Sequence, residues 1–144
     1  MNTYTLELRI DNRIGRITFG HPSKNAMTSE MLNKLAELID KANESQLCAI
    51  VLSSVGSSVF CAGANFDELL ALENEEQATA FFSGFAKVIL AIQRSKALVI
   101  GRIQGKAVGG GVGLIASCDY CFATETASIK LSEIGIGIAP LVIE

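Results

Sequence analysis

Residues 105–114 give the clearest indication of how this chain folds, and they read GKAVGGGVGL. Three consecutive glycines, Gly109 to Gly111, open an apolar segment that we expect to form a short helix over residues 109–117. A glycine inside a helix costs about 1 kcal/mol relative to alanine, so a bare backbone must be needed at this point. Two needs would explain it: tight packing of the helix against a strand, or N–H groups at the start of the helix that hold the negative charge of a ligand.

Hydrophobic patterns on both sides of this segment predict alternating strands and helices. Leu6 and Leu8 alternate with polar residues before a turn at 11–13, which is typical of a hairpin. Thr28 is suited to cap a helix, and the continuous apolar run 48–52 suits a strand buried on both faces. The expected elements are a hairpin over 6–19, helices over 28–44, about 75–93 and 109–117, and strands over 48–52, 98–103 and 120–123. This order predicts an α/β fold with right-handed crossovers.

The composition is that of one folded domain. With 49% hydrophobic residues in a chain of 144, the sequence can bury a core and is not disordered. Its 12 basic and 15 acidic residues are scattered and leave a net charge of −3, which makes nucleic acid and anionic membrane surfaces unfavourable partners. The first residues do not have the pattern of a secretion signal, and no apolar run approaches the roughly 18 residues of a membrane span. We therefore expect a cytoplasmic protein.

A second stretch of small residues, Cys61-Ala62-Gly63-Ala64-Asn65, follows the predicted strand 48–52 and its loop. If both glycine-containing stretches lie at the ends of adjacent strands, a backbone N–H group from each could point at one oxygen atom, as an enolate formed from a thioester requires. Packing alone would also explain this stretch. Glu133 favours the catalytic interpretation, because it lies among isoleucine and leucine residues and a carboxyl group in apolar surroundings suits a general acid or base. The alternative is an exposed glutamate in a turn.

Other motifs in the chain are weaker. Residues 111–116 match the dinucleotide-binding pattern G-x-G-x-x-A, but too few residues separate them from the next strand for a crossover helix. Residues 101–107 are one residue short of a Walker A loop and lack its Ser or Thr. The C-x-x-C of Cys118 and Cys121 has no second pair, and side chains three apart on a strand point to opposite faces, so we predict no metal site. His21 is the only histidine and is expected in a loop.

Three segments together resemble the crotonase superfamily, also called the enoyl-CoA hydratase/isomerase family. They are HPSKNAM at 21–27, FCAGANF at 60–66, and residues 105–119 with Ser132-Glu133-Ile134 after them. Their order and spacing match the family along the whole chain. The resemblance implies an α/β fold built as a crotonase-like spiral of β-β-α units. It also implies that residues 1–144 form a single core domain that lacks the family's C-terminal helical part.

The resemblance further implies an acyl-CoA enzyme, with the thioester oxygen held by the N–H groups of Ala64 and Gly110 and the proton moved by Glu133. The other residues that it implies in substrate binding are Lys24, Ala26, Ala62, Phe66 and Gly109, the first three near the nucleotide end of coenzyme A. It implies no cofactor beyond the coenzyme A of the substrate. A homotrimer or hexamer is expected if the chain is full length.

The chain departs from the family pattern at three points. Hydratases of the family carry two glutamates, and at the position of the first this chain has Gly113. Asn65 replaces an aspartate, and the chain is shorter than family members. A lone carboxylate can still move a proton between carbon atoms, so we expect a hydratase or isomerase, with isomerisation favoured by the missing acid. The alternatives are a non-catalytic module that binds CoA thioesters and an inactive fragment.

Overall fold

A β-hairpin begins the fold, as the alternation of apolar residues predicts. The structure is a computed structural model and describes residues 3–140. Strand β1 (Thr5–Asp11) pairs antiparallel with β2 (Ile14–Gly20), and the turn residues Asn12 and Arg13 both have positive φ. Two successive residues with positive φ match the twist of a two-residue hairpin turn, so the turn itself fixes the register of this pair.

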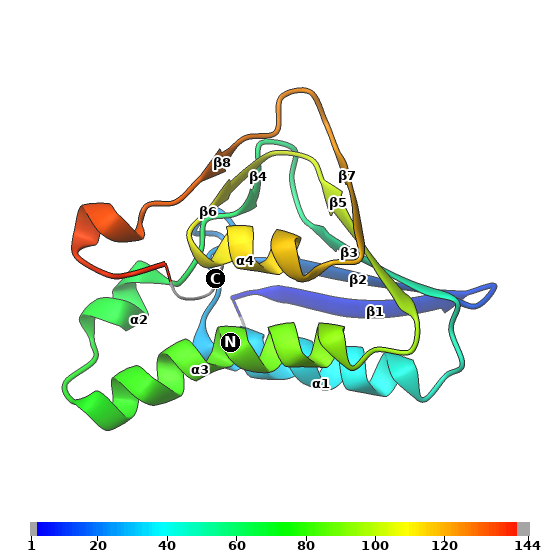
Figure 1. The fold of residues 1–144 in the computed structure, drawn as a ribbon, viewed down its shortest axis with the longest axis horizontal. Helices are drawn as coiled ribbons and strands as arrows, with labels where there is room; N and C mark the ends of the chain where they lie inside the picture. Colours follow the sequence, from blue (N-terminus) through cyan, green and yellow to red (C-terminus); the bar gives the residue numbers. More distant parts are fainter. Residues whose placement is uncertain (1–2, 141–144) are drawn as a thin grey trace.

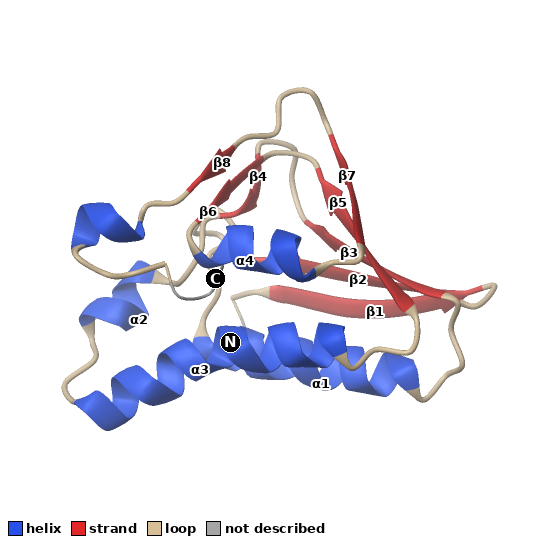
Figure 2. Ribbon diagram, in the orientation of Figure 1, coloured by secondary structure: helices blue, strands red, loops and turns tan. Residues whose placement is uncertain are grey.

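Two β-sheets contain the strands of the described chain (Figure 2). The larger sheet has the order β1-β2-β3-β5-β7, and its pairs after the hairpin are parallel. The smaller sheet is parallel and has the order β4-β6-β8. The remaining strands are β3 (Ala49–Ser54), β4 (Val59–Cys61), β5 (Leu98–Ile103), β6 (Lys106–Val108), β7 (Tyr120–Ala123) and β8 (Ile129–Lys130). The bounds of β5 and β7 agree with those predicted from the sequence.

The chain winds through both sheets in a repeating order (Figure 1). From β3 on, each strand of the larger sheet is followed by a strand of the smaller sheet and then by helical structure. The helices are α1 (Ser29–Asn43), α2 (Phe66–Leu70), α3 (Glu75–Gln93), α4 (Gly110–Ser117) and the short 3₁₀ helix η1 (Glu133–Ile136). This order confirms the predicted spiral of β-β-α units. Within residues 3–140, no helix combines the length and the apolar character needed to cross a membrane.

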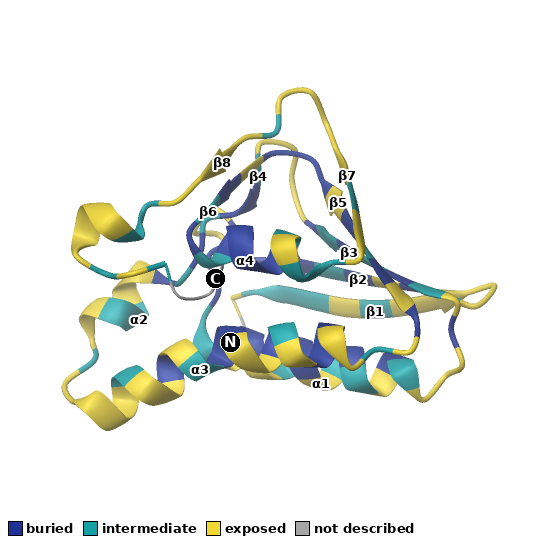
Figure 3. Ribbon diagram, in the orientation of Figure 1, coloured by how far each residue is buried: buried dark blue, intermediate teal, exposed yellow. Residues whose placement is uncertain are grey.

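Helices α1 and α3 lie side by side on one face of the larger sheet and enclose the core with it (Figure 3). The predicted helix cap is present, because the Thr28 hydroxyl accepts a hydrogen bond from Met31 N at 3.2 Å. Leu35 of α1, Val88 of α3 and Ile50 of β3 belong to the same buried core. The apolar stripe of α1 therefore stabilises the helix through tertiary packing as much as through its cap.

We expect the substitution Leu35→Ala to lower the free energy of unfolding by about 2–5 kcal/mol, because it leaves a cavity in a well-packed core. The Leu35 side chain is fully buried. Urea unfolding followed by circular dichroism would measure the change. Glu37→Ala on the exposed face of the same helix is the matched control and should change stability by no more than about 0.5 kcal/mol. Similar losses in the two variants would contradict the assignment of Leu35 to the core.

Strand β3 differs from its prediction in one respect. We expected burial on both faces, but its residues alternate between buried and half-buried positions. Ile50 and Leu52 face the core, whereas the opposite face is only partly covered. The reason is that the short helix α4 packs mainly against α3, β4 and β6 rather than against β3.

Candidate active site

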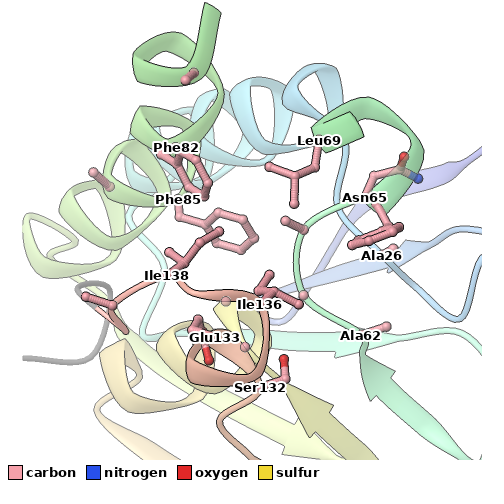
Figure 4. Close-up of a pocket in the computed structure, with 18 of the residues that line it drawn as sticks. Ala26, Ala62, Asn65, Leu69, Phe82, Phe85, Ser132, Glu133, Ile136 and Ile138 are labelled. Atoms are coloured by element: carbon pink, nitrogen blue, oxygen red, sulfur yellow. The ribbon is translucent and has the colours of Figure 1, made fainter. Parts of the chain in front are cut away.

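The two stretches of small residues border a cavity of about 1100 Å³ that α2, α3 and η1 also line (Figure 4). Its wall is largely apolar and includes Phe82 and Phe85 of α3 and Ile136 of η1. Of the residues predicted for the site, those that line the cavity are Glu133, Ala64, Gly110, Ala26, Ala62, Phe66 and Gly109. Lys24 is not part of the lining. A cavity of this size and character suits an elongated, mainly apolar ligand.

The first bend, residues 61–64, is fixed from both sides. Met27 N donates to Gly63 O at 2.8 Å, and Asn65 N donates to Met27 O at 2.8 Å. Gly63 has a φ of +91°, and a Cβ atom there would lie 2.8 Å from the carbonyl oxygen of Val108. Glycine is required because it alone tolerates both this conformation and this close approach. Among residues 3–140, the N–H group of Ala64 has no hydrogen-bond acceptor.

The second bend, residues 108–111, leads from β6 into α4. Gly109 has a φ of +53°, and its N–H group donates to Lys130 O at 3.0 Å. Gly110 is the first residue of α4, so its N–H group lies at the positive end of the helix dipole and has no acceptor within the helix. The rest of the described chain also offers it no acceptor.

The two bends pack directly on each other. The nitrogen of Gly110 lies 3.4 Å from the position that a Cβ atom of Gly63 would occupy. A Cβ atom at Gly111 would lie 2.6 Å from the carbonyl oxygen of Cys61. Both explanations for the triple glycine therefore apply. The missing side chains let the two bends pack closely, and at the cavity wall two N–H groups have no acceptor among the described residues.

Glu133 reaches the second bend because β8 pairs with β6. Val108 and Lys130 are partners in this pair, so η1 begins close to Gly109. Glu133 Oε1 lies 3.2 Å from the position of a Cβ atom at Gly109. Glu133 Oε2 is buried and has no hydrogen-bond partner within the described residues. A buried polar atom without a partner is costly, so this oxygen is the one expected to meet a ligand or a water molecule.

The loop before α1 supports the first bend from the outside. His21 lies in this loop, as predicted. The carbonyl oxygen of Lys24 accepts a hydrogen bond from Ala62 N at 3.2 Å, while the Lys24 side chain is exposed. The buried amide of Asn25 donates to Val59 O at 2.9 Å, which holds β4 in place next to the loop.

The cysteines differ in part from the sequence prediction. Cys61 is fully buried, and this burial raises the pKa of its thiol to about 12, so the thiol stays protonated near neutral pH. The sulfur atoms of Cys118 and Cys121 lie 3.3 Å and 2.9 Å from the position of a Cβ atom at Gly101, so they share one side of β5. The prediction that they point to opposite faces was wrong, because Cys118 ends α4 and precedes strand β7. The residues described contain no cluster of three or more metal-ligating side chains.

Several lining residues were not predicted from the sequence as members of the site, among them Phe85, Phe82 and Ser132. Phe85 packs against Gly110 so closely that a Cβ atom at that glycine would overlap its ring. Its spacing on α3 is that of a core residue, and nothing in the sequence indicates this second contact. Phe82 lines the cavity from the same helix. Ser132 also lines the cavity, and its position directly before Glu133 is the one signal that could have identified it.

A comparison of the chain with known families now adds to this geometry. The sequence profile of the family described as Enoyl-CoA hydratase/isomerase matches residues 9–143. The chain belongs to this family. Among enoyl-CoA hydratase/isomerase relatives, the short-chain-enoyl-CoA hydratase of Clostridium acetobutylicum is 29% identical over 135 residues, which cover 92% of this chain and 51% of that protein. The ethylmalonyl-CoA decarboxylase of Xenopus tropicalis is 27% identical over 133 residues, which cover 92% and 44%.

Solved structures of enoyl-CoA hydratase/isomerase proteins share this fold. Human enoyl-CoA hydratase domain-containing protein 3 superimposes with a TM-score of 0.88 at 26% identity, covering 96% of this chain and 55% of that one. The chain thus spans about half the length of the relatives that it matches. The similarity confirms the crotonase-type fold that the sequence motifs and the order of elements indicate.

Proposed function

We propose that this chain binds an acyl-CoA thioester and stabilises its enolate, which forms when the carbon atom next to the thioester carbonyl loses a proton and is consumed when that carbon gains one. In this proposal the N–H groups of Ala64 and Gly110 donate to the thioester oxygen, and Glu133 carries the proton. The observation on which it depends is a pair of N–H groups that have no acceptor in the described part of the chain and belong to two closely packed bends at one cavity. Donors that are fixed before the reaction stabilise developing charge without having to reorganise.

The position of Glu133 supports its role as the base. Its carboxylate lies over Gly109, the residue next to the proposed donor Gly110, and one of its oxygens has no partner in the described chain. The cavity wall is largely apolar and includes Phe85 and Ile136, and hydrogen bonds to an enolate oxygen are stronger in apolar surroundings than in water. The proton transfer uses the side chain of Glu133 alone, so the proposal includes no cofactor beyond the coenzyme A of the substrate.

The coenzyme A part of the substrate is proposed to lie at the rim near Ala26 and Ala62. Both residues line the cavity at the end formed by the loop before α1. The exposed Lys24 neighbours Ala62 through its backbone, and its ammonium group is suited to act as a point charge for a phosphate. The names of the two relatives above both refer to CoA thioesters, but to different reactions. The type of reaction must therefore be argued from the residues of this chain.

Binding of an enolate analogue tests this proposal. Acetoacetyl-CoA readily forms an enolate, so its oxygen should take up the hydrogen bonds of Ala64 and Gly110 fully. We expect it to bind at least ~100-fold more tightly than free coenzyme A, since analogues of a charged intermediate gain interactions that the ground state lacks. Isothermal titration calorimetry would give both dissociation constants.

Butyryl-CoA is the matched ligand, because it has the same length of acyl chain but stays in the keto form. It should bind more weakly than acetoacetyl-CoA. A non-catalytic module that only recognises CoA thioesters would bind the two acyl-CoAs equally well, and that result would contradict the proposal.

A further inference from the structure

The hydroxyl group of Ser132 lies at the wall of the cavity and has no hydrogen-bond partner among residues 3–140. Ser132 occupies the N-cap position of η1, but its side chain makes no capping hydrogen bond. Its Oγ atom lies 3.6 Å from the position of a Cβ atom at Gly109. The oxygen of an N-cap serine normally accepts a hydrogen bond from a backbone N–H group of the helix, so this hydroxyl group does not serve as the cap of η1.

Ser132 and Glu133 face the same small space. Glu133 Oε1 lies 3.2 Å from the same Cβ position at Gly109, and the space exists because Gly109 has no side chain. Figure 4 shows both residues at one end of the cavity. A carboxylate accepts hydrogen bonds, whereas a hydroxyl group both donates and accepts them. The two side chains together therefore offer both an acceptor and a donor at this part of the cavity wall.

Gly110 and Gly113 lie three residues apart on one face of α4, and neither position carries a polar side chain. Of the two, Gly110 lines the cavity. The side-chain atoms nearest to the Cβ position of the neighbouring Gly109 are those of Glu133 and Ser132.

We propose that Ser132 is a catalytic residue that, together with Glu133, binds the water molecule added across the double bond of a 2-enoyl-CoA. This inference rests on the proposed function and names its substrate as the 2-enoyl thioester. It differs from the expectation from the sequence that the missing acid favours isomerisation, since hydration needs a group that holds the water molecule and isomerisation does not.

In the proposed reaction, water adds to C3 and a proton then adds to C2. The water oxygen forms a bond to C3 while Glu133 takes one of its protons, and the electrons of the C2–C3 double bond move to the thioester oxygen. The N–H groups of Ala64 and Gly110 stabilise the resulting enolate. Glu133 then gives the same proton to C2, which restores the thioester and the carboxylate. Ser132 keeps its own proton and holds the oxygen atom of the water in line with C3.

Two assays, carried out on the unmodified protein and on its variants, separate the role of Ser132 from that of Glu133. The first is hydration of a 2-enoyl-CoA. The second is exchange of the C2 hydrogens of butyryl-CoA in D₂O, which needs the base and the oxyanion donors but no bound water. We expect Ser132→Ala to slow hydration ~10- to 100-fold, the effect of losing one hydrogen bond to the nucleophile, and to leave exchange within about twofold.

Two control variants complete the test. Ser132→Thr keeps the hydroxyl group and should retain most of the hydration rate, while Ser57→Ala in an exposed loop should behave as the unmodified protein. Thermal unfolding of each variant would show that it is folded. Equal losses in both assays for Ser132→Ala, or an unchanged hydration rate, would overturn the inference.

The inference and the proposed function can fail separately. If the unmodified protein exchanges the C2 hydrogens but hydrates no 2-enoyl-CoA, the role of Ser132 is wrong and the enolate chemistry stands. If it exchanges no hydrogens at all, the proposed function is wrong, and the proposed role of Ser132 is then wrong as well.

Discussion

Replacement of Glu133 by glutamine is expected to abolish turnover and to leave the affinity for acyl-CoA nearly unchanged. Glutamine has almost the same shape, so the cavity and the two bends should remain as they are. The amide cannot take or give a proton, and positioned acid–base groups contribute typically 10²- to 10⁴-fold to the rate. Glu133 is the one carboxylate of η1, so no other residue of this helix can replace it.

Steady-state kinetics with a 2-enoyl-CoA would measure turnover. Calorimetric titration with acetoacetyl-CoA would measure the affinity for acyl-CoA. Glu125→Gln is the matched control, since Glu125 is an exposed glutamate in the connection between β7 and β8. It should leave both the rate and the affinity unchanged. If Glu133→Gln turns over substrate as fast as the Glu125→Gln control, Glu133 does not carry the proton.

Local patterns in the sequence predicted the long elements well. Helix α3 has the predicted bounds, and Thr28 caps α1 through a side-chain hydrogen bond as expected. These features depend on interactions between residues close in sequence, such as caps and the helical repeat of apolar side chains. The strands of the smaller sheet, β4, β6 and β8, could not be predicted in this way. Strands of two or three residues show no periodicity, and they exist only because distant segments pair.

The sequence predicted those residues of the candidate site whose type is unusual for their local surroundings. Glycines in a helix start and a carboxylate among isoleucines stand out in any sequence, and the structure places Gly110 and Glu133 at the same cavity. The packing of Phe85 on Gly110 could not be foreseen, because it depends on how α3 crosses the start of α4. Lys24 was expected to contact the substrate, but the described structure leaves its side chain outside the cavity lining. That role therefore stays a prediction.

The missing acid at Gly113 shows how little a motif on one helix reveals about a site. The sequence of α4 indicates which side chains stand on that helix, whereas the pairing of β6 with β8 brings η1 to the bend at Gly109. Which groups border the cavity beside α4 therefore depends on tertiary structure.

Replacement of Gly63 by alanine is expected to lower the catalytic rate about 100- to 1000-fold, the usual cost of losing one oxyanion donor. Gly63 has a φ of +91°, and an added Cβ atom would lie 2.8 Å from Val108 O and 3.4 Å from Gly110 N. The first bend must move away from the second to relieve this contact. The proposed convergence of the Ala64 and Gly110 N–H groups on one oxygen atom would then be lost, although Glu133 is untouched.

Gly56→Ala is a sharp control for this variant, because it separates backbone strain from the loss of the close approach. Gly56 has a φ of +86°, similar to that of Gly63, but nothing lies within 4 Å of the position of its Cβ atom. Both variants should lose stability, since alanine is strained at positive φ. Only Gly63→Ala should lose activity and its preference for acetoacetyl-CoA over butyryl-CoA. If the two variants retain equal activity and equal preference, the bends do not act together on the substrate, and the assignment of Ala64 and Gly110 as paired donors is wrong.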